Sequence, residues 1–373
     1  MASSTIEQLP KIAVCHEWFD NIGGGEKVLF ELLEITRASK LFVLWADKEL
    51  VKELPCEVET SFLQRFPQKV RRQLGLFFMP LAWLMLRKKL RNYDLVVSSS
   101  WAFAHFASRY QKLDISYVHT PGRYWWFPEI DRRTKWAIPK TVFRLLRWID
   151  KLGTSQFIVY LANSATTQKR IRQCWGRESK VVNPPVDTEF YSRDAATNIA
   201  PFDKYLLGVG RFVEYKNHKF IIQLGEKLGI PVILVGQGEL YSELKRYGSE
   251  SSIPVHVIQQ ATNIELRNLY SFADCLVYPV IEDFGIVAVE AMSCGTRVLG
   301  LDQAGLKETV VQNVTGFLCE ELTLDSFYNG YSKLPEHNPN QIASYAQKYG
   351  RKKFHQEIQF IIDTTLSKNR IQS

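Results

Sequence analysis

The 373-residue sequence lacks the features that would mark a membrane-spanning, disulfide-bonded or metal-binding protein. No apolar run approaches the ~18–20 residues that a spanning helix needs. The six cysteines, at positions 15, 56, 174, 275, 294 and 319, form no Cys-x-x-Cys pair and no cluster with histidine at metal-ligand spacing. The first residues show no basic stretch followed by an apolar one, as a secretory signal would. We therefore expect free thiols, a reducing compartment and a cytoplasmic protein.

The sequence also lacks an excess of acidic residues. The formal net charge is +8, and cations gather in the first half of the chain, at 65–72, 87–91 and 132–147. Hydrophobic residues make up 46% and charged residues 23%, which excludes a disordered chain, and the length suits two domains. A basic protein prefers negatively charged partners, and charge alone leaves nucleic acid, an anionic membrane and a phosphorylated substrate open.

Short β-rich runs alternate with helical patterns along the chain, which indicates parallel α/β architecture. Strands are predicted at 12–15, 41–45, 95–98, 115–118, 157–161, 232–235, 255–258, 276–278 and 297–299, and helices at 217–228, 265–272 and 286–293. The pattern breaks at Asn183-Pro184-Pro185. We predict α/β domains at 1–185 and 204–340, a linker at 186–203 and a helical segment at 341–373. Because ligands bind at the carboxyl ends of parallel strands, the expected site is a cleft that the two domains share.

The strongest chemical pattern is a pair of glutamates, Glu282 and Glu290, around a predicted helix start. Eight residues is a little over two helical turns, so both carboxylates are expected to point the same way. Backbone N–H groups at Gly285, Ile286 and Val287 would face an oxygen-rich or anionic ligand. The vicinal hydroxyls of a sugar and of a ribose suit such carboxylates. A capped helix with two solvated glutamates is the alternative that the spacing leaves open.

Cations follow the first strand of the second predicted domain. Gly210 and Arg211 end the run 208–211, and Lys216 comes next, beside a helix start. An arginine fork and a lysine at such a place favour a phosphate site, although a solvated basic loop would explain either residue alone. Neither this run nor 236–238 matches Gly-x-Gly-x-x-Gly, which argues against a nicotinamide dehydrogenase.

The first predicted domain offers further candidates. Gly24 and Gly25 follow its first strand, where glycine lets a phosphate or sugar approach the backbone; an ordinary strand-to-helix turn is the alternative. His119 ends another strand, in the run His-Thr-Pro-Gly-Arg, and a lone histidine also suits a structural role. His16, which also follows a strand, and Arg123 are further candidates for contact with a ligand.

An apolar run at 74–86 contains Pro80 and has arginines and lysines on both sides. It is too short to span a bilayer. Basic flanks around Phe77, Phe78 and Trp83 are typical of a segment at the surface of an anionic membrane. A helix buried between sheets is the competing interpretation.

The segment from Glu282 to Ala291 resembles the Glu-x7-Glu motif of retaining glycosyltransferases of the GT-B fold, family 4, the bacterial polysaccharide and lipopolysaccharide group 1 glycosyltransferases. The likeness continues through Gly295 and at 308–310, covers nearly the whole chain and is most specific from 208 to 310. The sequence departs from the family at Arg297, where the family has proline, and at 302–306, which replace a glycine-rich turn. These departures concern the surroundings of the sugar or acceptor.

The resemblance implies a GT-B α/β fold: two Rossmann-like parallel-sheet domains face a central cleft, and a C-terminal helix returns to the N-terminal domain. It implies that Glu282 binds the hexose and that Glu290 binds the ribose. It also implies that Arg211 and Lys216 bind the diphosphate and stabilise the leaving group. His119 would lie beside the hexose as the fourth catalytic residue, and His16 and Arg123 would lie on the side of the acceptor. The implied donor-binding residues are Gly24, Gly25, Gly210, Arg211, Lys216, Val257, Ile258, Glu282, Phe284, Gly285, Ile286, Val287 and Glu290, with backbone contacts to the base near 257–258.

We therefore predict a retaining hexosyltransferase that uses a nucleotide-sugar donor, UDP-glucose as the first choice, and a glycan or lipid-linked oligosaccharide acceptor in polysaccharide synthesis. GDP-mannose is the alternative donor, because His-Thr-Pro with a following Arg-Tyr also resembles bacterial polysaccharide mannosyltransferases. The chain contains no Asp-x-Asp pair, so neither a metal nor another cofactor is expected. The protein is expected in the cytoplasm, with peripheral contact to the inner face of the plasma membrane, and its oligomeric state is left open.

A basic nucleic-acid-binding protein is the alternative from another class. Trp125-Trp126 and Arg132-Arg133 would suit the stacking and charge of a single strand. No recognised nucleic-acid motif appears, so nucleic acid is not the expected partner.

Overall fold

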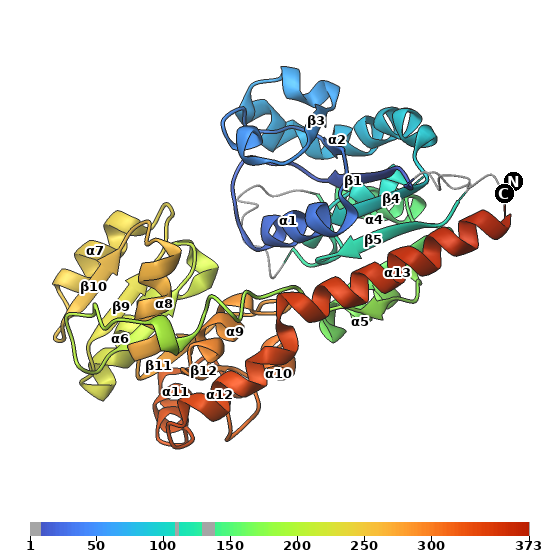
Figure 1. Cartoon of the computed structure of the whole chain (residues 1–373). Helices are drawn as coiled ribbons and strands as arrows, with labels where there is room; N and C mark the ends of the chain where they lie inside the picture. Colours follow the sequence, from blue (N-terminus) through green and yellow to red (C-terminus); the bar gives the residue numbers. More distant parts are fainter. Residues whose placement is uncertain (1–8, 109–111, 129–138, 373) are drawn as a thin grey trace, which may run out of the picture. The chain divides into compact units, whose positions relative to one another are not determined.

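The computed structural model describes residues 9–108, 112–128 and 139–372. The chain divides into two compact units: unit 1 contains residues 1–182 and 355–373, and unit 2 contains residues 183–354. Each unit is built on one parallel sheet with helices packed against it (Figure 1).

The described part of unit 1 has a seven-stranded parallel sheet in the order β3-β2-β1-β4-β5-β6-β7. Every residue of β1, β4 and β5 is buried, as expected where helices cover both faces of a parallel sheet. The strands are β1 (Ile12–His16), β2 (Lys40–Val43), β3 (Glu57–Thr60), β4 (Leu95–Ser100), β5 (Asp114–Val118), β6 (Ile158–Ala162) and β7 (Lys180–Val181). The helices are α1 (Gly24–Thr36), α2 (Gln68–Arg87), α3 (Arg123–Trp126), α4 (Lys140–Leu152), α5 (Ala165–Trp175) and, from His355 on, α13 (Arg351–Gln372).

Residues 183–354 are all described, and their sheet has six parallel strands in the order β10-β9-β8-β11-β12-β13. The strands are β8 (Leu206–Val209), β9 (Val232–Val235), β10 (Val255–Ile258), β11 (Cys275–Tyr278), β12 (Arg297–Leu301) and β13 (Gly316–Cys319). The helices are α6 (His218–Leu228), α7 (Tyr241–Ser249), α8 (Asn263–Phe272), α9 (Ile286–Ser293), α10 (Leu306–Thr309), α11 (Leu324–Tyr331) and α12 (Pro339–Ala346).

Both sheets have the same doubly wound topology. In each unit the first strand lies in the middle, the second and third strands extend to one side, and the fourth and later strands extend to the other. The strand order therefore reverses between β1 and β4 in unit 1, and between β8 and β11 in unit 2. Ligands of such sheets bind at the carboxyl ends of the strands beside this reversal, which is therefore where a site is expected in each unit.

The unit boundaries differ from the expected linker. Within the stretch 186–203, Val186 and Tyr191 are buried in the core of unit 2, so that stretch packs as part of the unit. Helix α12 also belongs to unit 2, and the C-terminal helix α13 belongs to unit 1 from His355 on. The polar sequence of the stretch 186–203 predicts a linker because its few apolar side chains carry no periodic pattern.

Helix α2 continues through Pro80. The helix runs from Gln68 to Arg87 with Pro80 buried inside it. Proline removes one backbone hydrogen bond and weakens an isolated helix. Tight packing of Met79, Trp83 and Leu86 into the core of unit 1 stabilises the helix on both sides of the proline.

Candidate functional site

The carboxyl ends of β8 and β11 bring two of the sequence candidates together. The Lys216 ammonium forms an ion pair with Glu282 and lies 3.5 Å from the hydroxyl of Tyr278, which donates a hydrogen bond to the same carboxylate. Lys216 is 6% exposed, whereas the Glu282 side chain is 24% exposed. Burial and the Glu282 charge raise the pKa of Tyr278 well above its usual value, so the phenol stays protonated. The result is a cation, a carboxylate and a donor at the expected edge of the sheet.

The backbone around Lys216 explains the position of its side chain. Gly210 has φ +148°, and a Cβ atom there would lie 3.5 Å from the Lys216 side chain. Asn217 adopts a left-handed conformation, with φ 54°, and donates its side-chain amide to the carbonyl of Pro279 at 2.7 Å. The loop after β8 is therefore tied to the residue that follows β11.

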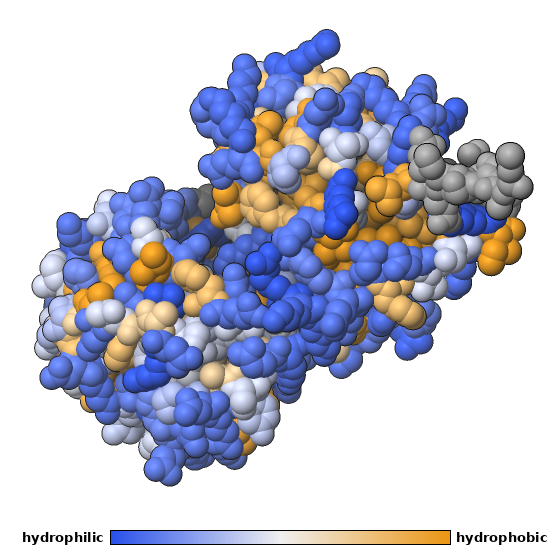
Figure 2. Space-filling view, in the orientation of Figure 1, coloured by the Kyte–Doolittle hydropathy of each residue, from blue (hydrophilic) through white to orange (hydrophobic). Residues whose placement is uncertain are grey.

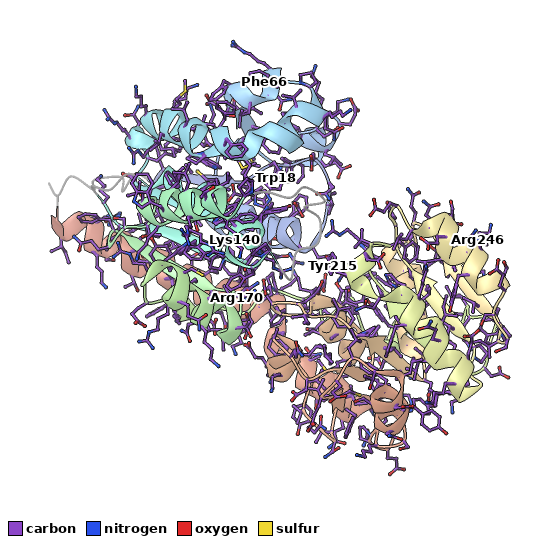
Figure 3. The ribbon with its side chains drawn as sticks, turned by 180° about the vertical axis from the view of Figure 1, so that it is seen from behind. Trp18, Phe66, Lys140, Arg170, Tyr215 and Arg246 are labelled. Atoms are coloured by element: carbon purple, nitrogen blue, oxygen red, sulfur yellow. The ribbon has the colours of Figure 1, made fainter. Side chains whose placement is uncertain are left out.

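Arg211 lies beside this group with its side chain exposed. Its guanidinium donates to the hydroxyl of Tyr215 at 3.0 Å (Tyr215 is labelled in Figure 3). The backbone carbonyl of Arg211 lies 3.1 Å from Nε2 of the buried His218. Burial lowers the pKa of His218 to about 4, so this imidazole is neutral near pH 7 and supports the loop as a hydrogen-bonding group.

Helix α9 begins as the glutamate motif predicts. Gly285 precedes it with φ 86°, a left-handed conformation that favours glycine, and no side chain caps the helix. The first backbone N–H groups of a helix, here those of Ile286 and Val287, have no intrahelical partner and suit an anion. Phe284 is only 3% exposed and packs against Tyr349, so a ligand would meet its backbone rather than its ring.

Glu290 is buried, and the alternative of two solvated glutamates is therefore wrong. It is 3% exposed, and the hydroxyl of Tyr270 donates to its carboxylate at 3.2 Å. The last predicted donor contacts, Val257 and Ile258, are half-buried on the edge strand β10.

Unit 1 places its predicted residues at the ends of β1 and β5. Nε2 of His119 lies 2.8 Å from the Ser99 hydroxyl, and the His119 backbone N–H donates to Ser100. Gly24 and Gly25 form the first turn of α1. His16 is fully buried, so it lies beneath the surface that an acceptor would touch.

Glu26 links the glycine turn to His16. Its carboxylate accepts the backbone N–H of Gly23 at 2.8 Å, and its other oxygen lies 3.7 Å from Nε2 of His16. Burial acts to raise the pKa of Glu26, but hydrogen bonding and charge from His16 outweigh it and leave this pKa below its usual value. The pair therefore fixes the start of α1 relative to the end of β1.

Two buried carboxylates that the sequence analysis missed support this edge of unit 1. Oε1 of Glu17 accepts hydrogen bonds from the backbone N–H groups of Ala102 and Ala104, at 2.8 and 2.7 Å, and fixes the turn after β4. Oδ2 of the fully buried Asp150 accepts the indole N–H groups of Trp125, Trp126 and Trp175 at 3.2, 2.6 and 2.8 Å. Through Trp125 and Trp126, Asp150 fixes α3, which begins at Arg123. The position of Glu17 after a strand was a sequence signal; Asp150 had none.

These bonds remove the main support for the nucleic-acid alternative. Trp125 is fully buried, and both neighbouring indoles bind Asp150, so the pair is not the expected stacking platform. Arg132 and Arg133 lie outside the described residues.

Helix α2 agrees in part with both interpretations of the run 74–86, the buried helix and the surface segment. One side packs into the core, whereas Phe77, Phe78, Leu81 and Met85 are each about half exposed. In Figure 2 the apolar areas are more extended over unit 1 than over unit 2. None of the helices in the described part of the chain has the length and hydrophobicity to cross a bilayer.

A group of potential metal ligands lies on α1 and α13. Ligand atoms of Glu31, Glu34 and His355 lie within 4.8 Å of one another, and His355 pairs with Glu31 at 2.5 Å. Surface acidic groups of this kind are common without a metal, and we assign no site to them.

Two family profiles together match most of the chain. Residues 22–190 match the profile of Glycosyltransferase Family 4, and residues 192–353 match that of Glycosyl transferases group 1. Among solved structures, Anabaena HepE in complex with UDP-glucose is similar, with a TM-score of 0.70, 20% identity, and coverage of 95% of this chain and 99% of that one. This likeness confirms the predicted GT-B α/β fold.

Curated relatives match over a shorter region. D-inositol 3-phosphate glycosyltransferase of Mycolicibacterium smegmatis is 30% identical over 174 residues, which are 43% of this chain and 40% of that protein. GDP-Man:Man(3)GlcNAc(2)-PP-Dol alpha-1,2-mannosyltransferase of Xenopus tropicalis is 28% identical over 187 residues, which are 44% of this chain and 38% of that protein. The chain thus spans about two fifths of the length of the curated relatives that it matches.

Proposed function

The chain belongs to the group 1 glycosyltransferases of the family 4 type, and from this premise we propose that it transfers a hexose from a nucleoside-diphosphate sugar to a glycan or lipid-linked oligosaccharide. The observation that carries the proposal is the group formed by Lys216, Tyr278 and Glu282 beside Gly210 and the start of α9. It offers charge, hydroxyl-binding oxygens and backbone N–H groups at one edge of a doubly wound sheet.

Each part of this group has a role in the proposed reaction. The barrier is the departure of a nucleoside diphosphate from the anomeric carbon, so positive charge facing the diphosphate stabilises the transition state. Arg211, Lys216 and the first N–H groups of α9 supply that charge. In the free protein Glu282 partly neutralises Lys216, and a bound diphosphate competes for the same ammonium.

The remaining assignments follow the family resemblance. Glu282 binds the donor hexose, Glu290 binds the ribose, and the backbone at 257–258 contacts the base. His119 positions the hexose, and Arg123 contacts the acceptor, with His16 beneath it. We further propose that transfer retains the anomeric configuration, with the acceptor hydroxyl giving its proton to the departing phosphate oxygen, and that cations of the protein replace a metal.

UDP-glucose is the proposed donor, and the fold likeness to a protein solved with UDP-glucose supports it. GDP-mannose is the second candidate, favoured by the likeness to a mannosyltransferase whose name includes GDP-Man.

Peripheral contact with an anionic membrane is the proposed role of the outer side of α2. The stretch 68–92 contains seven lysines and arginines and no acidic residue, and its exposed apolar side chains suit the interfacial region. Co-sedimentation with phosphatidylglycerol vesicles, but not with phosphatidylcholine vesicles, and its loss in Leu81→Asp, is the expected result. Equal sedimentation of Leu81→Asp would contradict it.

A thermal-shift screen tests the donor site. The purified protein is heated with UDP, GDP, ADP or TDP and with the corresponding sugars, with and without EDTA. A ligand that binds only the folded state raises Tm, so one nucleotide should shift the curve. The shift should be insensitive to EDTA and lost in Glu290→Ala. No shift from any nucleotide would contradict the proposed function.

A further inference from the structure

Four aromatic rings lie at the carboxyl end of the unit 1 sheet, and three of them have no role in the site described above. Trp45 follows β2 and Trp18 follows β1, each after one intervening residue, whereas Trp101 directly follows β4 and His119 directly follows β5. These strands are neighbours in the order β2-β1-β4-β5, so the rings fall in the same order along the edge of the sheet. We refer to Trp45, Trp18, Trp101 and His119 as the aromatic row.

Neighbouring rings of the aromatic row contact one another. Trp45 and Trp18 are stacked, with centroids 5.0 Å apart and an interplanar angle of 2°. Trp18 and Trp101 meet edge to face at 5.3 Å and 87°, and Trp101 and His119 meet at 5.4 Å and 67°. The row is therefore one continuous cluster of aromatic rings across four strands.

Two members of the row differ from the other tryptophans in their hydrogen bonding. Trp45 is 2% exposed and donates its indole N–H to Asp20 at 3.4 Å, so its ring is fixed in position. Trp18 and Trp101 are only half-buried, and within the described ranges neither donates its indole N–H to another residue (Trp18 is labelled in Figure 3). By contrast, buried carboxylates accept the indole N–H groups of Trp83, Trp125, Trp126 and Trp175.

We propose that the aromatic row is a saccharide-binding site, in which a pyranose ring of the acceptor lies against Trp18 and Trp101. A pyranose has a face of C–H groups, which the negative face of an aromatic ring attracts, and a rim of hydroxyls, which accept hydrogen bonds from indole N–H groups. The proposal rests on the transferase function proposed above. It deepens that function by naming the residues that recognise the acceptor as a sugar.

The position and rigidity of the row support this role. Trp18 and Trp101 follow β1 and β4, the two strands between which the strand order reverses and where ligands of such sheets bind. Glu17 fixes the backbone directly after Trp101. A Cβ atom on Gly25 would lie 2.9 Å from the Trp101 ring, so glycine lets α1 start against that ring. A preformed surface loses little conformational entropy when it binds a ligand.

The charges near the row are of both signs, because the Arg71 guanidinium lies 5.9 Å from the ring centroid of Trp45 and carboxylates lie nearby. Asp20 accepts from Trp45, and Glu26 lies beside His16, whose ring contacts Trp101 at 4.6 Å. Carboxylates accept hydrogen bonds from sugar hydroxyls and repel backbone phosphates. A neutral saccharide is therefore the ligand that these surroundings fit.

Ligand-observed NMR tests the proposal with four disaccharides: maltose, cellobiose, lactose and α-1,2-mannobiose. At least one should bind the wild type with a Kd on the order of millimolar. Trp18→Ala and Trp101→Ala should weaken that binding by ~10-fold or more, since each removes a stacking face and a donor. Trp148→Ala is the matched control, because Trp148 is 60% exposed on α4 outside the row. Trp18→Phe keeps a ring, and should retain part of the affinity if Trp18→Ala does not fold.

Two outcomes would overturn the proposal: no disaccharide binds the wild type up to ~100 mM, or Trp18→Ala and Trp148→Ala bind equally well. Binding of a thymidine oligonucleotide that is lost in Trp18→Ala would overturn it in favour of nucleic acid. The nucleotide thermal shift separates this test from that of the transferase. If a nucleotide raises Tm but no disaccharide binds, only the saccharide-binding site is refuted. If a disaccharide binds but no nucleotide raises Tm, the transferase function is refuted and the saccharide-binding site is retained.

Discussion

The two sheets have the same strand order, yet the side chains at their carboxyl ends have different chemistry. In unit 2 the loops after β8 and β11 carry the charged residues Arg211, Lys216 and Glu282, of which Arg211 is exposed, Glu282 is half-buried and Lys216 is buried. In unit 1 the loops after β1 and β4 carry Trp18 and Trp101, and the neighbouring carboxylates of Glu17 and Asp20 accept hydrogen bonds from the backbone and from an indole. One topology thus supports a site built on charge and a surface built on aromatic rings.

This contrast suggests a division of chemical work between the units. A diphosphate requires cations and N–H groups, which unit 2 offers, whereas a neutral sugar requires apolar faces and single donors, which unit 1 offers. Changes at the edge of unit 2 should therefore alter turnover and nucleotide affinity. Changes in unit 1 should alter sugar binding and the stability of that unit.

The largest expected effect comes from Lys216→Met. This change removes the buried cation of unit 2 and leaves Glu282 without its ion pair. We expect turnover to fall by ~10²–10³-fold, because positive charge at the diphosphate is the main source of transition-state stabilisation. Turnover would be measured with the donor that the nucleotide screen identifies.

Lys219→Met is the matched control for this variant. Lys219 lies three residues further on, and its more exposed ammonium pairs with Glu243. Its loss should leave turnover near the wild-type value. A similar fall in both variants would show that the effect comes from general loss of cations, and the contrast between the units would lose its basis.

Glu290→Gln should have a smaller effect, chiefly on nucleotide affinity. The carboxylate is buried and accepts from Tyr270, so the amide has nearly the same shape but binds ribose hydroxyls less strongly. We expect the Kd for the nucleotide to rise by ~10–100-fold, the loss of one or two charge-assisted hydrogen bonds. Calorimetric titration would measure it, with the exposed Glu321→Gln as control. An unchanged Kd would refute the ribose role.

The sequence predicted unit 2 more completely than unit 1. Helix α9 was predicted at its observed bounds, 286–293, because a strand, a glycine turn and an apolar run give it clear ends. The ion pair of Lys216 with Glu282 was not predicted, although both residues were chosen, because their contact depends on the pairing of β8 with β11. The aromatic row was missed for the same reason: Trp18, Trp45 and Trp101 are neighbours only once the order of the strands is known.

Buried polar groups were the other features that the sequence did not reveal. Asp150 lies in an amphipathic helix between lysine and isoleucine, and nothing in its spacing distinguishes it from a solvated residue. Its role depends on three indoles that come from two other helices, α3 and α5. Patterns along the chain predict elements, whereas such bonds arise only from the packing of elements that lie far apart in sequence.

The interior of unit 1 is tested through Asp150→Asn, whose expected effect is on stability rather than on turnover or nucleotide affinity. Burial raises the pKa of Asp150 from 3.8 to about 7, although the three indole N–H groups act to lower it. Between these values the folded protein holds a proton that the unfolded chain releases. The contribution of Asp150 to the free energy of unfolding is therefore full below pH ~4, and it falls by ~1.4 kcal/mol per pH unit until it is lost above pH ~7.

Asp150→Asn should remove this pH dependence of the free energy of unfolding. His105 acts in the opposite direction, since burial lowers its pKa to about 4 and its contribution rises with pH up to 6.5. Its Nε2 lies 3.4 Å from Oδ1 of Asp150, so the two groups are coupled. The difference between wild type and variant, from urea unfolding at pH 5, 6, 7 and 8, reports Asp150 together with its effect on the neighbouring His105. The exposed Asp363→Asn, also in unit 1, should run parallel to the wild type. If Asp150→Asn also ran parallel, the carboxyl would be ionised throughout this range, and unit 1 would hold a buried charge as unit 2 does at Lys216.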